Sequence, residues 1–341
     1  MKGNGFPGSI RTVNQYLKEV HGEKLYKLAL DAGFTCPNRD GTLGRGGCIF
    51  CSAGGSGDFA EGANGIQQGR ENKRIGAPEE QSDVRTDAKV IREGRCHVFT
   101  RAELDQILEK GKQRLSGKYH GERFIAYLQA YTNTYAPVED LRMLYKELLD
   151  RSEVAGLSIG TRPDCVDEEI VLLLAKLQKE YEKEGKFIWV ELGLQTANEE
   201  VAGKIRRSYS NAVFEKTMQR LNEAGIPVIV HLILGLPGET RKDMTESVRY
   251  INRFQPFGVK FQLLHVLKGT ELSHMYERKE FDALSMEEYM ELLESCLREL
   301  DPNIVVHRMT GDGPKKLLIA PLWSADKKRV MNEIRKRFCL P

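Results

Sequence analysis

Short apolar segments alternate with amphipathic segments along most of this 341-residue chain. The apolar segments share the length and composition of strands, and they cover 24–30, 123–129, 156–160, 187–194, 226–234 and 258–266. Most are nearly continuous apolar runs, which is the pattern of parallel strands covered on both faces. Alternation of this kind predicts a parallel sheet whose strands are joined by crossover helices.

Helix-starting signals lie between the predicted strands. Thr100 and Glu103 have the spacing of a capping box, and Ser285 and Glu288 repeat it. Other helices are predicted over 138–150, after Asp167, from Asn211 and from the turn at Glu239 and Thr240. We expect Glu239 to cap the helix that follows it. A last possible strand covers 303–309.

Six strand–helix units are too few to close an eight-stranded barrel. The predicted fold class is therefore α/β, a partial (βα)6 barrel of the TIM type with a C-terminal α/β extension. We expect an N-terminal segment over 1–22, a core over 23–266 and a basic extension over 267–341. Within the core, residues 54–95 hold eight glycines and mixed charges without a clear period. They predict a flexible surface insertion, or, less favoured, a lid that substrate orders.

Composition describes a globular protein, with 40% hydrophobic and 29% charged residues. No apolar run approaches the length of a transmembrane helix, and the first residues lack a secretory signal, so we expect a cytoplasmic protein without a membrane partner. The net charge is only +2, but positive residues gather between Lys315 and Arg337. This stretch could contact nucleic-acid phosphates, or it could be a solvated helix face.

Three cysteines stand close together, as C-x11-C-x2-C at Cys36, Cys48 and Cys51. Thiolates select zinc or iron–sulfur clusters, and complete four-iron clusters normally take four cysteines. The spacing favours a cluster with one iron left open. The alternative is a zinc site, which needs four ligands and could recruit Cys96 and His97 across the insertion.

Polar residues and glycines come at or just after the ends of the predicted strands. They are Gln129, Thr161, Gln195 and Gly235. Ligands of parallel α/β folds gather at the carboxyl ends of the strands, so these positions predict one binding site. Glu191 lies inside an apolar strand, where a carboxylate is costly unless it is paired. His231 and His265 also lie in apolar strands, as core residues or as substrate contacts.

Several longer motifs occur in a fixed order: AGFTCPNRDG with GGCIFC, LQAYTNTYAP, LSIGTRPDCV, ELGLQT, HLILGLPGET and GVKFQLLHVLKGTEL. With these motifs, over roughly residues 15 to 335, the chain resembles the radical S-adenosylmethionine (SAM) superfamily. Within it, the chain is similar to the branch shared with the catalytic subunit of Elongator, and in particular to the small bacterial family that includes YhcC and YtqA (also called MnmL).

The resemblance implies a role for each matching residue. Cys36, Cys48 and Cys51 would hold three irons of a [4Fe–4S] cluster, and SAM would chelate the fourth iron through its amine and carboxylate. Other residues are implied to contact SAM itself. Phe50 and Gly235 would lie near the adenine, and Gln129, Ala130 and Tyr131 near the amine. Glu191 would bind the ribose with Gln195 beside it, and Arg207 or its neighbour Arg206 would bind the carboxylate. For Gly235 the alternative is an ordinary tight turn.

The implied activity is reductive cleavage of SAM to a 5′-deoxyadenosyl radical that abstracts hydrogen from a substrate, with flavodoxin or ferredoxin as electron donor. The implied substrate is the wobble uridine of tRNA, held through the Lys315–Arg337 region, with its carboxymethylaminomethyl group converted to aminomethyl. Two alternatives stay open: a radical SAM enzyme for a small metabolite or tetrapyrrole, and a non-catalytic iron–sulfur or zinc protein that binds a partner.

Overall fold

The computed structural model describes residues 10–55, 57–62, 94, 96–115 and 121–340. Its centre is an eight-stranded sheet in the order β2-β1-β3-β4-β5-β6-β7-β9, and every pair of neighbours in it is parallel. The strands are β1 (Tyr26–Asp31), β2 (Glu61–Gly62), β3 (Phe124–Leu128), β4 (Val154–Thr161), β5 (Phe187–Gln195), β6 (Val228–Leu234), β7 (Gly258–Leu263) and β9 (Val305–Arg308). The predicted α/β class and open barrel are confirmed, since β2 and β9 remain at the two edges.

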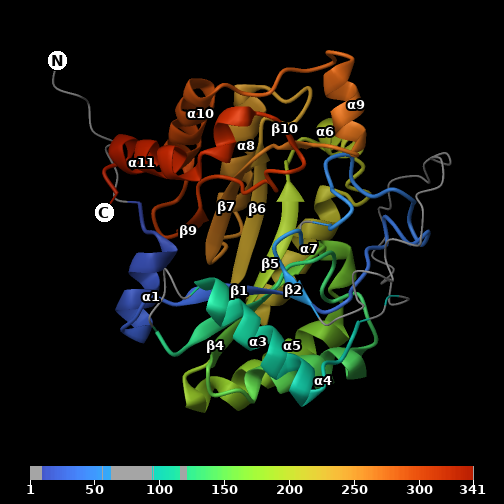
Figure 1. The fold of residues 1–341 in the computed structure, drawn as a ribbon, viewed down its shortest axis with the longest axis vertical. Coiled ribbons are helices and arrows are strands. Elements are labelled where there is room, and N and C mark those ends of the chain that lie inside the picture. The colour runs from blue at the N-terminus through green and yellow to red at the C-terminus, as the bar shows by residue number, and fades with distance from the viewer. Residues whose placement is uncertain (1–9, 56, 63–93, 95, 116–120, 341) are drawn as a thin grey trace.

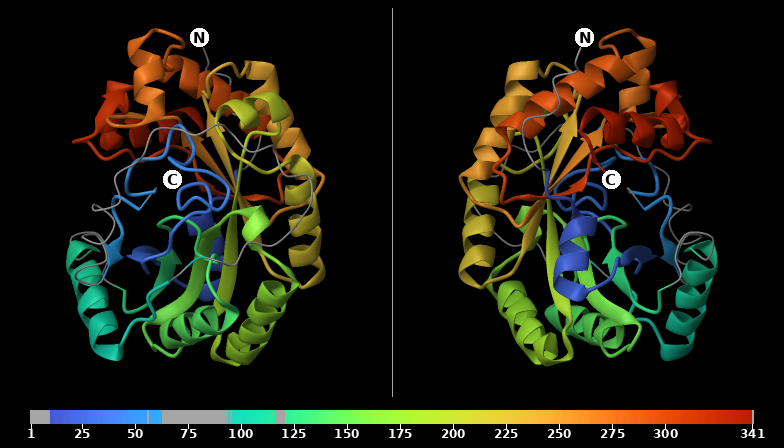
Figure 2. Two further views of the ribbon diagram at one scale, coloured as in Figure 1. Left: turned by 90° about the vertical axis from the view of Figure 1, so that its right-hand side faces the viewer. Right: turned by 90° about the vertical axis from the view of Figure 1, so that its left-hand side faces the viewer.

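Helices cover the outside of the curved sheet, as Figure 2 shows. In chain order they are α1 (Val13–His21), α3 (Arg101–Leu115), α4 (Val138–Leu149), α5 (Glu168–Tyr181), α6 (Glu199–Lys204), α7 (Asn211–Glu223), α8 (Arg241–Asn252), α9 (Glu271–Glu277), α10 (Met286–Glu299) and α11 (Lys327–Arg337). Capping boxes at Thr240 and Ser285 begin α8 and α10, and Asp167 caps α5 through the Ile170 N–H.

Alternate residues of each strand face opposite sides, and the two sides differ in chemistry. On β5, Ile188, Val190 and Leu192 belong to the large apolar core that packs under the helices. Residues on the opposite face of the same strand, such as Glu191 and Gln195, line a cavity inside the barrel. The strands are therefore buried on both faces, as their composition predicts, but the inner face is polar.

The N-terminal helix α1 packs at the end of the barrel opposite the cavity. Its Leu17 and Tyr16 contact a separate apolar cluster that contains Trp189 and Phe257. The rings of Tyr16 and Phe257 lie 4.8 Å apart, edge to face. Thr12, just before α1, pairs with Val306 of β9. This end of the barrel is closed by apolar packing, which leaves the carboxyl ends of the strands as the open end (Figure 1).

The C-terminal extension continues the core. β9 extends the large sheet beside β7, and α10 packs on α8. A small antiparallel ribbon of β8 (Val266–Leu267) and β10 (Leu318–Ala320) lies beside the barrel mouth. Of the insertion, the structure describes residues 54–55, 57–62 and 94, which include the edge strand β2. The predicted flexibility of the insertion lies outside the described residues. Every helix of the described residues is too short or too polar to span a bilayer.

Candidate active site

A cavity of about 420 Å³ lies inside the barrel at the carboxyl ends of the strands. The predicted site residues that line it are Cys36, Cys48, Phe50, Cys51, Gln129, Tyr131, Glu191, Gln195 and Arg207. His231 and His265 line it as well. Ala130 and Gly235 do not. The fold thus brings most of the predicted residues together from six separate parts of the chain.

The cysteine loop is held in place by hydrogen bonds to its own backbone and to the loop after α6. Asn38 donates from its side-chain amide to the Arg206 carbonyl at 2.8 Å, and the Cys48 thiol lies 3.5 Å from the same oxygen. Arg39 donates to the carbonyls of Cys51 and Ser52 at 2.9 and 2.6 Å. Protein contacts therefore shape the loop that presents the thiols.

The three thiols are free and act on one another electrostatically. A hydrogen bond from the Cys51 thiol lowers the pKa of Cys48 to about 6, with help from nearby Arg162 and Arg39. The same hydrogen bond, together with burial, raises the pKa of Cys51, and burial raises that of Cys36. Because the thiolate is the ligand form, Cys48 is already poised to bind a metal near neutral pH.

The donor set fits a cluster better than a single ion. Within the described residues, no group of three or more His, Cys, Asp or Glu side chains is arranged to hold one metal ion. In a four-iron cluster each thiolate binds a different iron. The three thiols therefore need to line the same cavity, but they need not converge on a single metal ion. Cys96 packs against the helical core, His97 pairs with Glu103 at 3.0 Å, and neither residue lines the cavity that the three thiols share.

The residues directly after β3 contact the segment that follows the cysteine loop. Tyr131 has a left-handed backbone (φ 62°), its N–H donates to the Gly55 carbonyl at 3.0 Å, and its phenol donates to the Ala53 carbonyl. Ala130 is fully buried, and a Cβ added at Gly57 would meet its methyl group at 2.5 Å. Of the three residues expected at the SAM amine, Gln129 and Tyr131 face the cavity, whereas Ala130 is a packing residue.

Glu191 lies at the centre of a charged cluster inside the barrel. Its oxygens accept from Ser158 at 2.5 Å and His231 at 2.6 Å, and they form ion pairs with both Lys27 and Lys260. A carboxylate offers about four acceptor positions. Protein groups fill all of them, so this structure leaves no acceptor on Glu191 for a ribose hydroxyl.

Burial and charge act in opposite directions on this cluster. Burial alone would raise the pKa of Glu191, but Lys260, Lys27 and His231 outweigh it and hold that pKa well below its usual range. Burial lowers the pKa of both lysines, and each is lowered further by positive neighbours. Burial and Lys260 lower the pKa of His231 to about 4, so this ring is neutral, and its Nδ1 accepts from the side-chain amide of Gln262 at 3.1 Å.

Arg207 differs from the expectation that it binds the SAM carboxylate. Its side chain is 1% exposed, and its five N–H donors are all used within the protein. They donate to the carbonyls of Leu194, Thr196 and Tyr209 and to the side chains of Glu199 and Asn211. This arginine ties the end of β5 to the start of α7, and it has no donor left for a ligand. Its neighbour Arg206 uses its backbone carbonyl to hold Asn38.

The turn after β6 also differs from the expectation. Gly235 has φ 93°, a left-handed backbone that favours glycine, and a Cβ there would lie 2.9 Å from the Leu284 side chain, so the turn itself accounts for the glycine. The cap of α8 is Thr240, not Glu239, because the Thr240 hydroxyl accepts from the Asp243 N–H. The Glu239 carboxylate turns inward, and neither oxygen has a partner in the described residues.

The structure adds five basic residues to the cavity wall that were not among the predicted site residues: Lys27, Arg39, Arg162, Lys260 and Arg308. A signal for two of them existed. Lys27 and Lys260 stand inside apolar strands, which is the same criterion that singled out Glu191. Arg162 follows β4, forms a bidentate pair with Asp164 at 2.6 and 2.9 Å, and lowers the pKa of Cys36 against the effect of burial.

Two family models match the chain. Residues 43–251 match the Radical SAM superfamily, and residues 256–339 match the Radical_SAM C-terminal domain. This chain belongs to the radical SAM superfamily. The first match covers most of the cavity-lining strands, and the second covers β7 to α11.

Relatives of known sequence support the same branch. The chain is 39% identical to the uncharacterized protein YtqA of Bacillus subtilis, over 98% of this chain and 93% of that one. It is 31% identical to the protein YhcC of Escherichia coli, over 93% and 88%. It is 30% identical, over 48% of this chain and 30% of the other, to the tRNA uridine(34) acetyltransferase of Methanocaldococcus infernus.

A solved structure has the same fold. The archaeal Elp3 of Methanocaldococcus infernus aligns with a TM-score of 0.54 and 20% identity, covering 69% of this chain and 61% of that one. This likeness shows the shared fold, whereas the YtqA and YhcC relatives confirm the small bacterial family that was named from the sequence motifs.

Proposed function

We propose that this protein is a tRNA-modifying radical SAM enzyme that converts the carboxymethylaminomethyl group on carbon 5 of the wobble uridine to aminomethyl. The observation that carries the proposal is the cavity itself, which has three thiols on one wall and an excess of cations on another. The tRNA part rests on the relative named tRNA uridine(34) acetyltransferase, which matches about half of this chain.

Cys36, Cys48 and Cys51 would hold the [4Fe–4S] cluster. When bound, the cluster and SAM supply one-electron cleavage of the sulfonium and removal of a hydrogen atom from the substrate. The chain's own residues position and enclose the reactants. Phe50 offers an aromatic face beside the thiols, Gln129 and Gln195 offer amides, and the apolar cluster behind Phe50 keeps water from that wall.

The overall conversion balances without an external oxidant. SAM, water and the carboxymethylaminomethyl group would give methionine, 5′-deoxyadenosine, glyoxylate and the aminomethyl group. The two electrons lost when the N–CH2 carbon becomes the aldehyde carbon of glyoxylate are the two that convert SAM to methionine and 5′-deoxyadenosine. A flavodoxin or ferredoxin would be needed to prime the cluster.

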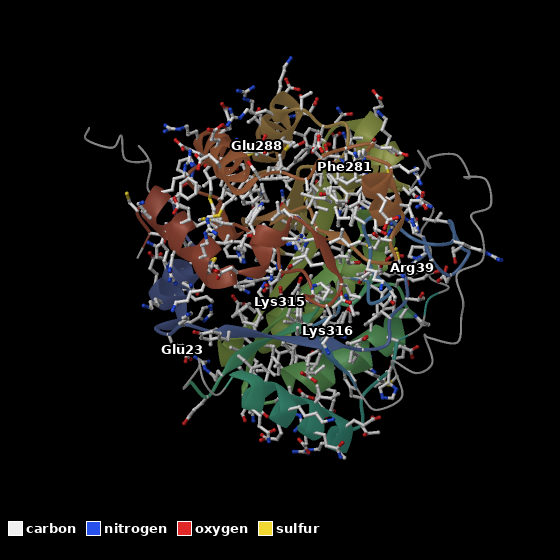
Figure 3. The ribbon with its side chains drawn as sticks, turned by 45° about the horizontal axis from the view of Figure 1, so that its top comes forward. Glu23, Arg39, Phe281, Glu288, Lys315 and Lys316 are labelled. Atoms are coloured by element: carbon white, nitrogen blue, oxygen red, sulfur yellow. The ribbon has the colours of Figure 1, made fainter. Side chains whose placement is uncertain are left out.

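Positive residues beside the cavity offer a path for RNA. Lys315 and Lys316 are exposed, and they directly follow the loop 311–314 that lines the cavity (Figure 3). On α11, Val330 and Ile334 are buried while Lys328, Arg329 and Lys336 are exposed on the other side. Not every basic residue of the stretch is available, since Arg337 pairs with Glu287 and Glu294 and Lys327 pairs with Asp312.

The test is anaerobic reconstitution of the cluster, followed by reduction in the presence of SAM and an anticodon stem-loop RNA that carries the carboxymethylaminomethyl uridine. We expect 5′-deoxyadenosine and glyoxylate in equal amounts. A Cys48→Ala variant should form neither, whereas a Cys339→Ala variant, which changes an exposed cysteine outside the cavity, should match the wild type. Formation of 5′-deoxyadenosine by Cys48→Ala would overturn the cluster assignment.

The substrate has its own test. In cells that lack the gene, carboxymethylaminomethyl uridine should accumulate in tRNA at the expense of aminomethyl uridine. An unchanged nucleoside profile, together with 5′-deoxyadenosine formation in vitro, would point to the small-metabolite alternative.

A further inference from the structure

We propose that Lys27, Lys260 and Arg308 form a carboxylate-binding site inside the barrel, and that this site receives the carboxylate of the substrate. The identity of the substrate rests on the proposed function above, but the anion site itself rests on charge and geometry alone. The three residues come from β1, β7 and β9, and all three line the cavity.

Positive charge exceeds negative charge in this part of the cavity. Glu191 is the carboxylate among these cations, and it is shared by two lysines. His231 and His307 add no charge, since burial lowers the pKa of both rings. Tyr127 carries no charge either, because burial raises the pKa of its phenol. Burial lowers the pKa of Lys27 and Lys260 as well, but the Glu191 carboxylate with which both form ion pairs opposes that shift. With Arg308, three basic side chains share this single carboxylate.

The remaining acidic residues of the cavity wall have other partners. Asp58 accepts from the Ser52 hydroxyl at 2.9 Å, and Asp312 pairs with Lys327 outside the cavity. Uncompensated charge in a buried site is costly, and an anion that enters the site would remove that cost.

Arg308 is the member with free binding capacity. It has no ion pair or hydrogen bond to any other described residue, and its side chain reaches the cavity. Its strand position is directly opposite Lys260. The two positive charges repel each other, and Arg308 lowers the pKa of Lys260 further. A planar carboxylate between them would bind the guanidinium through two parallel hydrogen bonds and the ammonium through a third.

The cations beside the cysteine thiols differ from the cations around Glu191. The cations that affect the cysteine thiols are Arg39 and Arg162. Lys27, Lys260 and Arg308 instead affect Glu191, Tyr127 and one another. SAM is expected to place its own carboxylate on the open iron beside the thiols. The second set of cations is therefore available for a second carboxylate, and the carboxymethylaminomethyl group carries one.

The anion site is tested first with the cluster-loaded protein and no RNA. At constant ionic strength, acetate should raise the thermal midpoint of unfolding in a saturable way, and its neutral analogue acetamide should not, because a ligand that binds only the folded state stabilises it. Arg308→Met should abolish the acetate effect and Arg308→Lys should retain part of it. Arg101→Met, which changes an exposed arginine on α3, is the matched control and should respond as the wild type does.

Equal stabilisation of wild type and Arg308→Met by acetate would overturn the site. So would stabilisation by inorganic phosphate but not by acetate, since this would assign the cations to a phosphate.

The source of the carboxylate is tested with two stem-loop RNAs, one with the carboxymethylaminomethyl group and one with its methyl ester. Wild type should bind the acid at least about tenfold more tightly, equivalent to about 1.4 kcal/mol, and Arg308→Met should bind the two alike. The affinity for SAM should stay unchanged in Arg308→Met. A loss of SAM affinity instead would assign the site to SAM. If acetate binds through Arg308 but neither RNA binds wild type, the proposed tRNA function fails and the anion site stands.

Discussion

Lys260 on β7 and Glu191 on β5 form an ion pair across the intervening strand β6, inside the barrel. His231 on β6 lies between them and donates its Nε2–H to the same carboxylate. Lys27 reaches the other carboxylate oxygen from β1. One carboxylate thereby connects β1, β5, β6 and β7, and it fixes the positions of Lys27 and Lys260 on that wall of the cavity.

Glu191→Gln should strongly destabilise the protein. The carboxylate is buried, and removing its charge leaves two buried ammonium groups without a counter-charge. We expect the free energy of unfolding to fall by about 3–5 kcal/mol, as measured by urea denaturation. Glu200→Gln is the control, since its pair with Lys204 is exposed to solvent and its loss should change the free energy of unfolding little. Near-equal effects of the two substitutions would contradict the importance of the buried pair.

Arg207→Lys separates a structural role from a role in SAM binding. Lysine has three donors, so it cannot replace the five hydrogen bonds of this buried guanidinium. Unfolding should become easier by about 2–4 kcal/mol, while Arg101→Lys should change stability little. If Arg207→Lys kept its stability and lost affinity for SAM, the residue would have the role that its motif predicts.

Gly55→Ala should disturb the cysteine loop. A Cβ at this residue would lie 2.5 Å from the ring of Tyr131, and the backbone has φ 55°, which favours glycine. We expect a lower iron content after reconstitution than in wild type, measured per chain. Gly203→Ala is the matched control, because no atom lies within 4 Å of its added Cβ and its φ is ordinary. A wild-type iron content in Gly55→Ala would show that the loop tolerates the displacement.

Glu239 should make the protein less stable as the pH rises. Burial raises the pKa of its carboxyl to about 8, well above the ordinary value of an unfolded chain. Between these two values the folded state binds the proton more strongly, so this residue lowers the free energy of unfolding as pH rises from about 4.5 to about 8. Glu239→Gln should therefore be more stable than wild type at pH 8, by about 2 kcal/mol or more, and the two should converge near pH 5.

Urea denaturation at the two pH values measures this difference. Asp243→Asn is the comparison, since Asp243 is only partly buried and its pKa is lowered, first by its hydrogen bond with Thr240. That substitution should destabilise the protein at both pH values. A Glu239→Gln advantage that did not change with pH would contradict the titration.

The strand order was predictable because it follows from elementary rules. Apolar runs over 226–234 and 258–266 form β6 and β7, and parallel strands joined by helices place consecutive strands side by side. The capping signals at Ser285 and Asp167 were equally local, and both are confirmed. The edge strand β2 was not predictable from its two residues, because a strand that short has no period.

The candidate site was predictable in position more than in detail. Cysteine spacing and strand-end motifs brought Cys36, Gln129 and Gln195 to one cavity, as expected from the common carboxyl edge of parallel strands. Motif position gave no information on whether a side chain is already satisfied. Arg207 and Glu191 have the expected places, but their hydrogen bonds go to protein groups that are distant in sequence.

The sequence by itself determined the parallel α/β architecture, the cysteine loop and the family, because these depend on local pattern and spacing. Only the tertiary structure decided which charges share the barrel interior. More than sixty residues separate Lys27 from Glu191, and more than sixty separate Glu191 from Lys260. Each of the three is a charged residue in an otherwise largely apolar strand. Their ion pairs form because closing the strands into a barrel removes them from water together, and the carboxylate and ammonium groups then have only one another to bind.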